Sequence, residues 1–81
     1  MSFLKAKKLP DNVRVLTIFG AEYWMPWEDM RRGCSCFLPT TATAQQVAEL
    51  LGPIEKYLGW HFAVANRCEY GRYGVRIWRM V

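Results

Sequence analysis

The sequence predicts a small, single-domain α+β fold in which one helix packs on one face of a mainly antiparallel sheet. Three observations support this class. One amphipathic helical stretch lies in the middle of the chain, two short β-rich segments precede it, and two longer ones follow it around a glycine-rich turn. The predicted order is therefore ββαββ, which is typical of the α+β class.

Size and composition also fit one globular domain. The chain has 81 residues, of which 52% are hydrophobic and 22% charged, which favours a packed core over disorder. A chain this short is expected to lack room for a core together with a substrate pocket of several hundred Å³. Residues 1–10 carry Lys5, Lys7 and Lys8 and end at Pro10, so we expect a loose basic arm there.

Two strands are predicted before the helix. Residues 12–19 are rich in β-branched and apolar side chains and are bounded by a Pro-Asp pair and Gly20, which indicates a strand. Residues 34–38 form a shorter apolar segment between Gly33 and Pro39 and suggest a second strand. If the two strands pair antiparallel, residues 20–33 form the long connection between them.

The helix is the clearest element. Thr43 and Gln46 fit a capping box, in which each side chain accepts a hydrogen bond from a free backbone N–H. Helical spacing relates the apolar residues that follow, which are Val47, Leu50, Leu51, Ile54, Tyr57 and Leu58. Pro53 interrupts this stretch, so we expect either one kinked helix or two short helices in tandem. Gly59 is the expected C-terminal stop.

Two further strands complete the prediction. Residues 60–68 and 73–81 alternate in side-chain character, and the glycine-containing segment between them indicates a hairpin turn. Because the helix has one apolar stripe, it covers one sheet face only. The other face is expected to be polar or to bind something.

The connection over residues 20–33 is the first candidate binding site. It combines large side chains, which are usually buried, with charged ones and with the turn-forming Gly20, Pro26 and Gly33. One interpretation is that the tryptophans fold back onto the core. The other is an exposed anchor patch for a partner, because Trp, Tyr and Met are enriched at binding hot spots. The candidate residues are Tyr23, Trp24, Met25, Trp27, Glu28, Asp29, Arg31 and Arg32.

The C-terminal hairpin is the second candidate. Arginines neutralise phosphates and aromatic rings stack on unpaired bases, so a hairpin carrying both could bind single-stranded RNA or DNA. The residues concerned are Arg67, Tyr70, Arg72, Tyr73, Arg76, Trp78 and Arg79. The alternative interpretation is an edge hairpin whose arginines serve solubility.

Metal binding and catalysis have little support in the sequence. Cys34, Cys36, Cys68 and His61 are the ligand types of a zinc site, but their spacing is unlike a zinc knuckle. A Cys–His nucleophile pair would need an orienting group and an oxyanion site, and no motif supplies them. We therefore expect no catalytic residue, no cofactor and no enzymatic activity.

These observations lead to an expected function. We expect a cytoplasmic, non-enzymatic binding protein that occupies a surface of a larger protein or nucleoprotein partner, and we expect no membrane association. Phage-encoded inhibitors of host machinery, anti-CRISPR proteins among them, have this general size and composition. The alternative is a single-stranded nucleic-acid-binding module, which the net charge of +4 would favour. The chain has twelve aromatic residues, more than the core of so short a chain is expected to need, and a homodimer would also cover this surplus aromatic surface.

Overall fold

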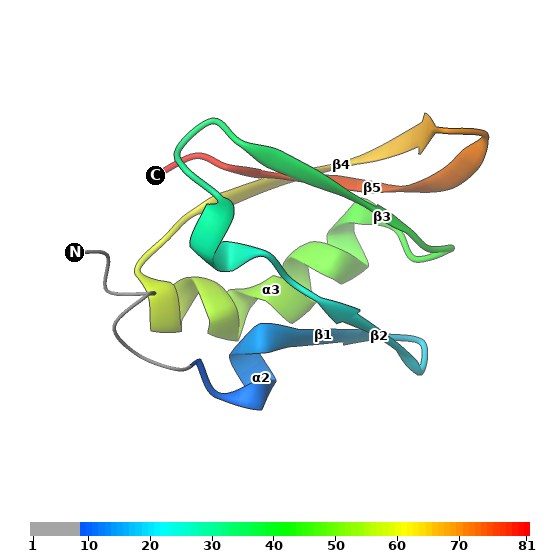
Figure 1. Cartoon of the computed structure of the whole chain (residues 1–81). Coiled ribbons are helices and arrows are strands. Elements are labelled where there is room, and N and C mark those ends of the chain that lie inside the picture. Colours follow the sequence, from blue (N-terminus) through cyan, green and yellow to red (C-terminus); the bar gives the residue numbers. More distant parts are fainter. Residues whose placement is uncertain (1–8) are drawn as a thin grey trace.

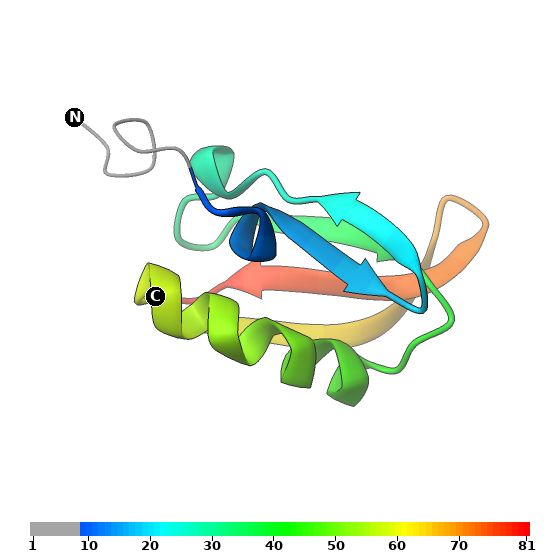
Figure 2. The same ribbon diagram turned by 90° about the horizontal axis from the view of Figure 1, so that it is seen from below.

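A computed structural model describes residues 9–81 of the chain. The three-stranded sheet forms one layer, and helix α3 and a small hairpin lie side by side beneath it (Figures 1 and 2). The elements in chain order are α2 (Asp11–Arg14), β1 (Val15–Ile18), β2 (Ala21–Trp24), the 3-10 helix η1 (Trp27–Asp29), β3 (Ser35–Pro39), α3 (Ala44–Leu58), β4 (Phe62–Glu69) and β5 (Arg72–Arg79). The α+β class is thereby confirmed.

The N-terminal part differs from the prediction. The expected strand over residues 12–19 is divided into the helical turn α2 and the short strand β1. The chain then reverses at Phe19 and Gly20, both at positive φ, and β2 pairs with β1 antiparallel. The antiparallel pairing considered for the first strand and residues 34–38 does not occur, because β1 pairs with β2 within this tight hairpin. The connection over residues 20–33 is not one loop, since it contains β2 and η1.

Helix α3 follows its sequence pattern closely. The Thr43 side chain accepts a hydrogen bond from the backbone N–H of Gln46, and the Gln46 side chain accepts one from Thr43, so the capping box is confirmed. One helix continues through Pro53, which excludes two tandem helices. Gly59 ends it in the left-handed conformation, as predicted. None of the helices in residues 9–81 is both long and apolar enough to cross a membrane.

The main sheet has the strand order β3-β5-β4 and is antiparallel throughout. Strands β4 and β5 form the predicted hairpin, whose two-residue turn has Tyr70 and Gly71 at positive φ, as in a type I′ turn. The short segment predicted as a strand near residues 34–38 exists as β3, but it pairs with β5. The central strand of this sheet is therefore the C-terminal strand β5, and the N-terminal strand β1 is not part of it.

The core lies between the sheet and the layer below it. Trp27 is completely buried, donates from its indole nitrogen to the Val13 carbonyl at 2.7 Å, and packs against Trp60 and Phe62. Leu9 is also buried, so the expected loose arm does not extend to Pro10; Lys5, Lys7 and Lys8 lie outside the described residues. The apolar core residues are Leu9, Val13, Leu16, Ile18, Met25, Trp27, Met30, Leu38, Ala42, Val47, Leu51, Ile54, Phe62, Val75 and Ile77.

Candidate functional site

The face of the main sheet that points away from α3 is covered by no element in the described part of the chain (Figure 1). The strand register decides which side chains lie on it. Directly paired residues of neighbouring strands lie on the same face, whereas successive residues along one strand alternate between the two faces. We call it the open sheet face. It consists of Ser35, Phe37, Pro39, Ala63, Ala65, Arg67, Glu69, Arg72, Gly74, Arg76 and Trp78.

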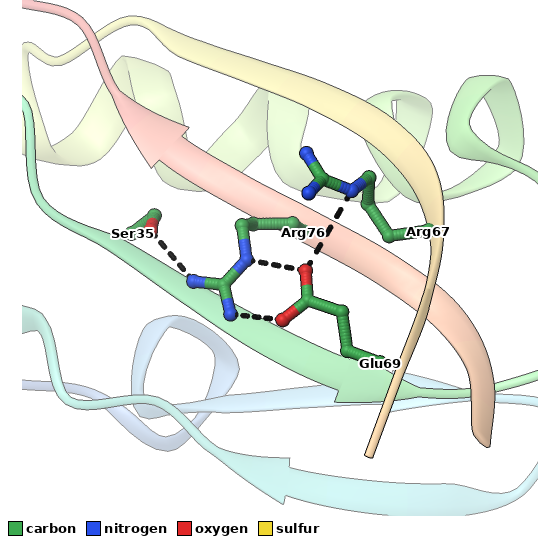
Figure 3. A network of polar contacts seen from close by, with 4 residues as sticks. All are labelled: Ser35, Arg67, Glu69 and Arg76. Atoms are coloured by element: carbon green, nitrogen blue, oxygen red, sulfur yellow. Dashed lines mark hydrogen bonds and ion pairs between the residues drawn. The ribbon is translucent and has the colours of Figure 1, made fainter. Parts of the chain in front are cut away.

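A polar network holds the centre of the open sheet face (Figure 3). Arg76 donates from Nε to Glu69 Oε2 at 2.7 Å, makes a second, parallel contact with Glu69 Oε1, and donates from Nη1 to Ser35 Oγ at 2.7 Å. The Arg67 Nε lies 3.7 Å from the same Glu69 carboxylate. Two parallel bonds between a guanidinium and a carboxylate fix both side chains.

The network also fixes the charge of its members. The hydrogen bond from Arg76 holds the pKa of Glu69 below its ordinary value, and the same bond raises the pKa of Arg76. Both groups are therefore charged at neutral pH and largely neutralise each other. Positive charge available to a ligand must come from the other arginines of the face.

Arg67 and Arg72 supply this charge. Both are exposed, and Arg72 makes no ion pair or side-chain hydrogen bond with any residue from 9 to 81. The guanidinium carbon of Arg67 lies 6.0 Å from the ring centroid of Trp78, which is a cation–π distance. Trp78 stays half exposed because its cross-strand neighbours are the small residues Ser35 and Ala63.

An open hollow of about 500 Å³ lies at one end of this face. Its volume contradicts the expectation that so short a chain has no room for a pocket, because the hollow forms on the uncovered sheet face and not in the core. Phe37 and Tyr70 meet there edge to face, with ring centroids 6.2 Å apart. The lining residues are Ser35, Cys36, Phe37, Pro39, Tyr70, Arg72 and Arg76.

Two of the predicted nucleic-acid-binding residues do not lie on this face. Tyr73 pairs with Cys68 and points to the opposite side of the sheet. Arg79 stacks on Trp60, with its guanidinium carbon 3.7 Å from the ring centroid, and donates to the Met30 carbonyl at 2.9 Å. Burial lowers the pKa of Arg79, with a smaller contribution from Arg32. Both residues are therefore removed from the predicted nucleic-acid set.

The predicted partner-binding set of residues 20–33 is divided between the core and the surface. Met25 and Trp27 are buried, so an exposed anchor is wrong for these two. Tyr23 is half-buried and donates its hydroxyl to the Pro39 carbonyl at 2.6 Å. Trp24 is 71% exposed.

The charged members of that set are also divided. Arg14, which the sequence did not single out, donates to Glu28 at 2.6 Å, so this carboxylate is already paired. Asp29, Arg31 and Arg32 are exposed. Phe19 is 69% exposed at the tip of the β1–β2 hairpin and was not predicted, since residues 12–19 were expected to form a strand.

The zinc alternative has no geometric support. Within residues 9–81 no three His, Cys, Asp or Glu side chains are grouped so that they could hold a metal ion. His61 lies 3.4 Å from Glu55, whereas Cys36 is half-buried on the inner side of β3, and burial raises the pKa of its thiol. Cys34 and Cys68 are exposed.

Sequence reasoning missed Ser35 and Phe37 as members of the site. Both lie on β3, for which only a pairing with the N-terminal strand was considered from the sequence. Their alternation along the strand is visible in the sequence, but only the pairing of β3 with β5 places them beside Arg76 and Trp78.

The comparison of the chain with protein-family models, curated proteins and solved structures finds no match.

Proposed function

We propose that the protein is a non-enzymatic binding module whose open sheet face binds single-stranded RNA or DNA. One observation carries the proposal: Arg67, Arg72 and Trp78 lie with Phe37 on a sheet face that no described element covers. Exposed arginines attract phosphates, and half-exposed rings stack on bases irrespective of sequence. A cytoplasmic location is part of this proposal.

The arrangement also suits an extended strand of nucleic acid. Aromatic side chains occur at both ends of the face, Trp78 at one and Phe37 with Tyr70 at the other, and the arginines lie between and beside them. The network of Glu69 and Arg76 keeps the sheet surface rigid between these positions. A preformed surface reduces the entropy that a ligand loses on binding.

Replacing Trp78 by alanine tests the proposal. We expect the Kd for a fluorescently labelled 12-nucleotide single strand to rise about five-fold or more, since one base–aromatic stack contributes about 1–3 kcal/mol. Fluorescence anisotropy at low salt, with RNA and DNA of one sequence, measures the change. Arg67→Ala is expected to weaken binding as well.

Lys56→Ala is the matched control, because Lys56 is exposed on α3, on the other side of the molecule. It removes one positive charge and is expected to change the Kd less than two-fold. Equal losses in Lys56→Ala and Arg67→Ala would contradict a specific face and indicate attraction by net charge alone. Circular dichroism of each variant confirms that it is folded.

A second candidate function is the masking of a protein partner by the β1–β2 hairpin. It is favoured by the exposure of Trp24 and Phe19, at 71% and 69%, on the β1–β2 hairpin, and this hairpin lies on the side of the molecule opposite the open sheet face. Exposed tryptophans are enriched among residues that dominate binding energy. Phage-type inhibitors of host machinery, including anti-CRISPR proteins, belong to this second proposal, as does a homodimer.

Trp24→Ala tests the second candidate. Tagged wild-type protein is used to capture binding partners from a host lysate. If the hairpin binds a protein, that protein should be absent from the capture with Trp24→Ala but present in the capture with Trp78→Ala. Quantitative mass spectrometry compares the two captures, and light scattering of the purified protein tests for a homodimer. Identical captures by both variants would exclude the hairpin as the interface.

A further inference from the structure

We propose that the hollow beside Tyr70 is a subsite for one nucleotide, in which the base stacks on Tyr70 and the adjoining phosphate binds Arg72. This inference rests on the proposed function and adds which residues bind one particular nucleotide of the strand. We call the site the Tyr70 subsite; it comprises Ser35, Phe37, Pro39, Tyr70, Arg72 and Arg76.

The size and lining of the hollow fit such a ligand. Its volume of about 500 Å³ lies within the range of small-ligand sites, roughly 300–1,000 Å³. The rings of Phe37 and Tyr70 line it, and Arg72 is exposed and makes no ion pair or side-chain hydrogen bond with any residue from 9 to 81. A base and a phosphate are the flat and the anionic halves of one nucleotide, so one ligand satisfies both kinds of side chain.

Tyr70 occupies a position that its turn does not favour. Its φ of 55° is left-handed, and type I′ turns take Asn, Asp or Gly there because a larger side chain is strained. The ring is nevertheless 86% exposed, so core packing does not explain the choice of tyrosine. Strained residues are concentrated at functional sites, and here the strained residue is one of those that line the hollow.

The side chain of Tyr70 touches the open sheet face at Phe37, while most of its surface is exposed to solvent. Its ring contacts Phe37, and its hydroxyl is a minor contributor, after Glu69, to the raised pKa of Arg76. Gly74 makes room for this arrangement, because a Cβ there would lie 2.8 Å from Phe37 Cζ. The subsite is thus built from strands β3 and β5 and from the turn that carries Tyr70.

Tyr70→Asn separates binding from folding. Asparagine suits the left-handed turn position, so the variant is expected to keep its melting temperature or to raise it. Removal of the ring should nonetheless raise the Kd for a labelled oligothymidine about five-fold or more. Phe19→Asn is the matched control, since it makes a similar change in the other hairpin turn, where φ is 51°, and should leave the Kd unchanged.

A second binding measurement distinguishes base stacking in the subsite from a general effect of removing the ring. It uses an oligonucleotide of the same length with abasic residues, which has phosphates but no bases to stack. Wild type should lose at least about five-fold in affinity on this change, and Tyr70→Asn should lose less. If Tyr70→Asn binds oligothymidine as wild type does, the subsite is wrong while the proposed function stands. If wild type binds neither RNA nor DNA, both are wrong.

Discussion

Trp27→Ala should lower the free energy of unfolding by about 3–5 kcal/mol, the usual cost of truncating a buried tryptophan. The side chain is completely buried and packs against Trp60 and Phe62, so its loss leaves a cavity. The Val13 carbonyl would also lose its donor, the indole N–H. In a domain of this size the melting temperature should fall by about 12 °C or more. Thermal unfolding followed by circular dichroism measures this change.

Trp24→Ala is the control for this prediction, because it makes the same substitution three residues away on an exposed side chain. Its effect on stability should stay within about 0.5 kcal/mol. The two variants therefore separate the core tryptophan from the surface tryptophan of one segment. Similar melting temperatures for both variants would contradict the burial of Trp27.

Gly74→Ala is expected to have the second-largest effect. A Cβ at this position would lie 2.2 Å from the Leu38 carbonyl oxygen, so strands β3 and β5 would have to move apart. Overpacking usually costs about 1–3 kcal/mol, and we expect the upper end because the obstructing atom belongs to the backbone. Chemical denaturation measures the difference in free energy of unfolding.

Gly52→Ala is the comparison for Gly74→Ala, because it makes the same substitution without a clash between strands. Gly52 lies inside α3, and apart from its chain neighbours and the backbone of the helix no heavy atom lies within 4 Å of a Cβ added there. Alanine in a helix interior is more favourable than glycine by about 1 kcal/mol, but Pro53 follows directly and crowds a Cβ on the residue before it, so the stability of this variant should stay much closer to wild type than that of Gly74→Ala. A neutral Gly74→Ala variant would show that β3 and β5 are not packed as closely as described.

Helix α3 and the C-terminal hairpin could be predicted because their signals are local. The capping box at Thr43, the helical spacing of apolar residues and the stop at Gly59 all lie within a few residues of what they determine. The turn at Gly71 is likewise specified by its own glycine. These elements are where sequence reasoning and structure agree.

The N-terminal pairing could not be predicted for a physical reason. The β1–β2 hairpin turns at Phe19, and an aromatic residue at positive φ is not a usual turn signal, so the segment looked like one continuous strand. Strand pairing between distant segments is also not visible in a local pattern. The partners of β3, and with them the composition of the open sheet face, therefore required the structure.

The two tryptophans of residues 20–33 show the same difficulty on a smaller scale. Composition predicted more aromatic surface than one interior could bury, and both interpretations of the segment were consistent with that. The structure buries Trp27 under the sheet and leaves Trp24 exposed. No property of the sequence distinguished the two indoles, because their environments are created by η1 and by segments far away in the chain.

The salt dependence of binding to a single-stranded oligonucleotide is the sharpest test of whether the open sheet face binds phosphates. If Arg67 and Arg72 each neutralise a phosphate, log Kd should rise with log salt concentration with a slope of about 1.4, and Arg72→Ala should reduce this slope by about 0.7. Phosphate contacts weaken markedly between about 50 and about 200 mM salt. The absence of binding, or an equal affinity at these two salt concentrations, would contradict nucleic-acid binding by the open sheet face.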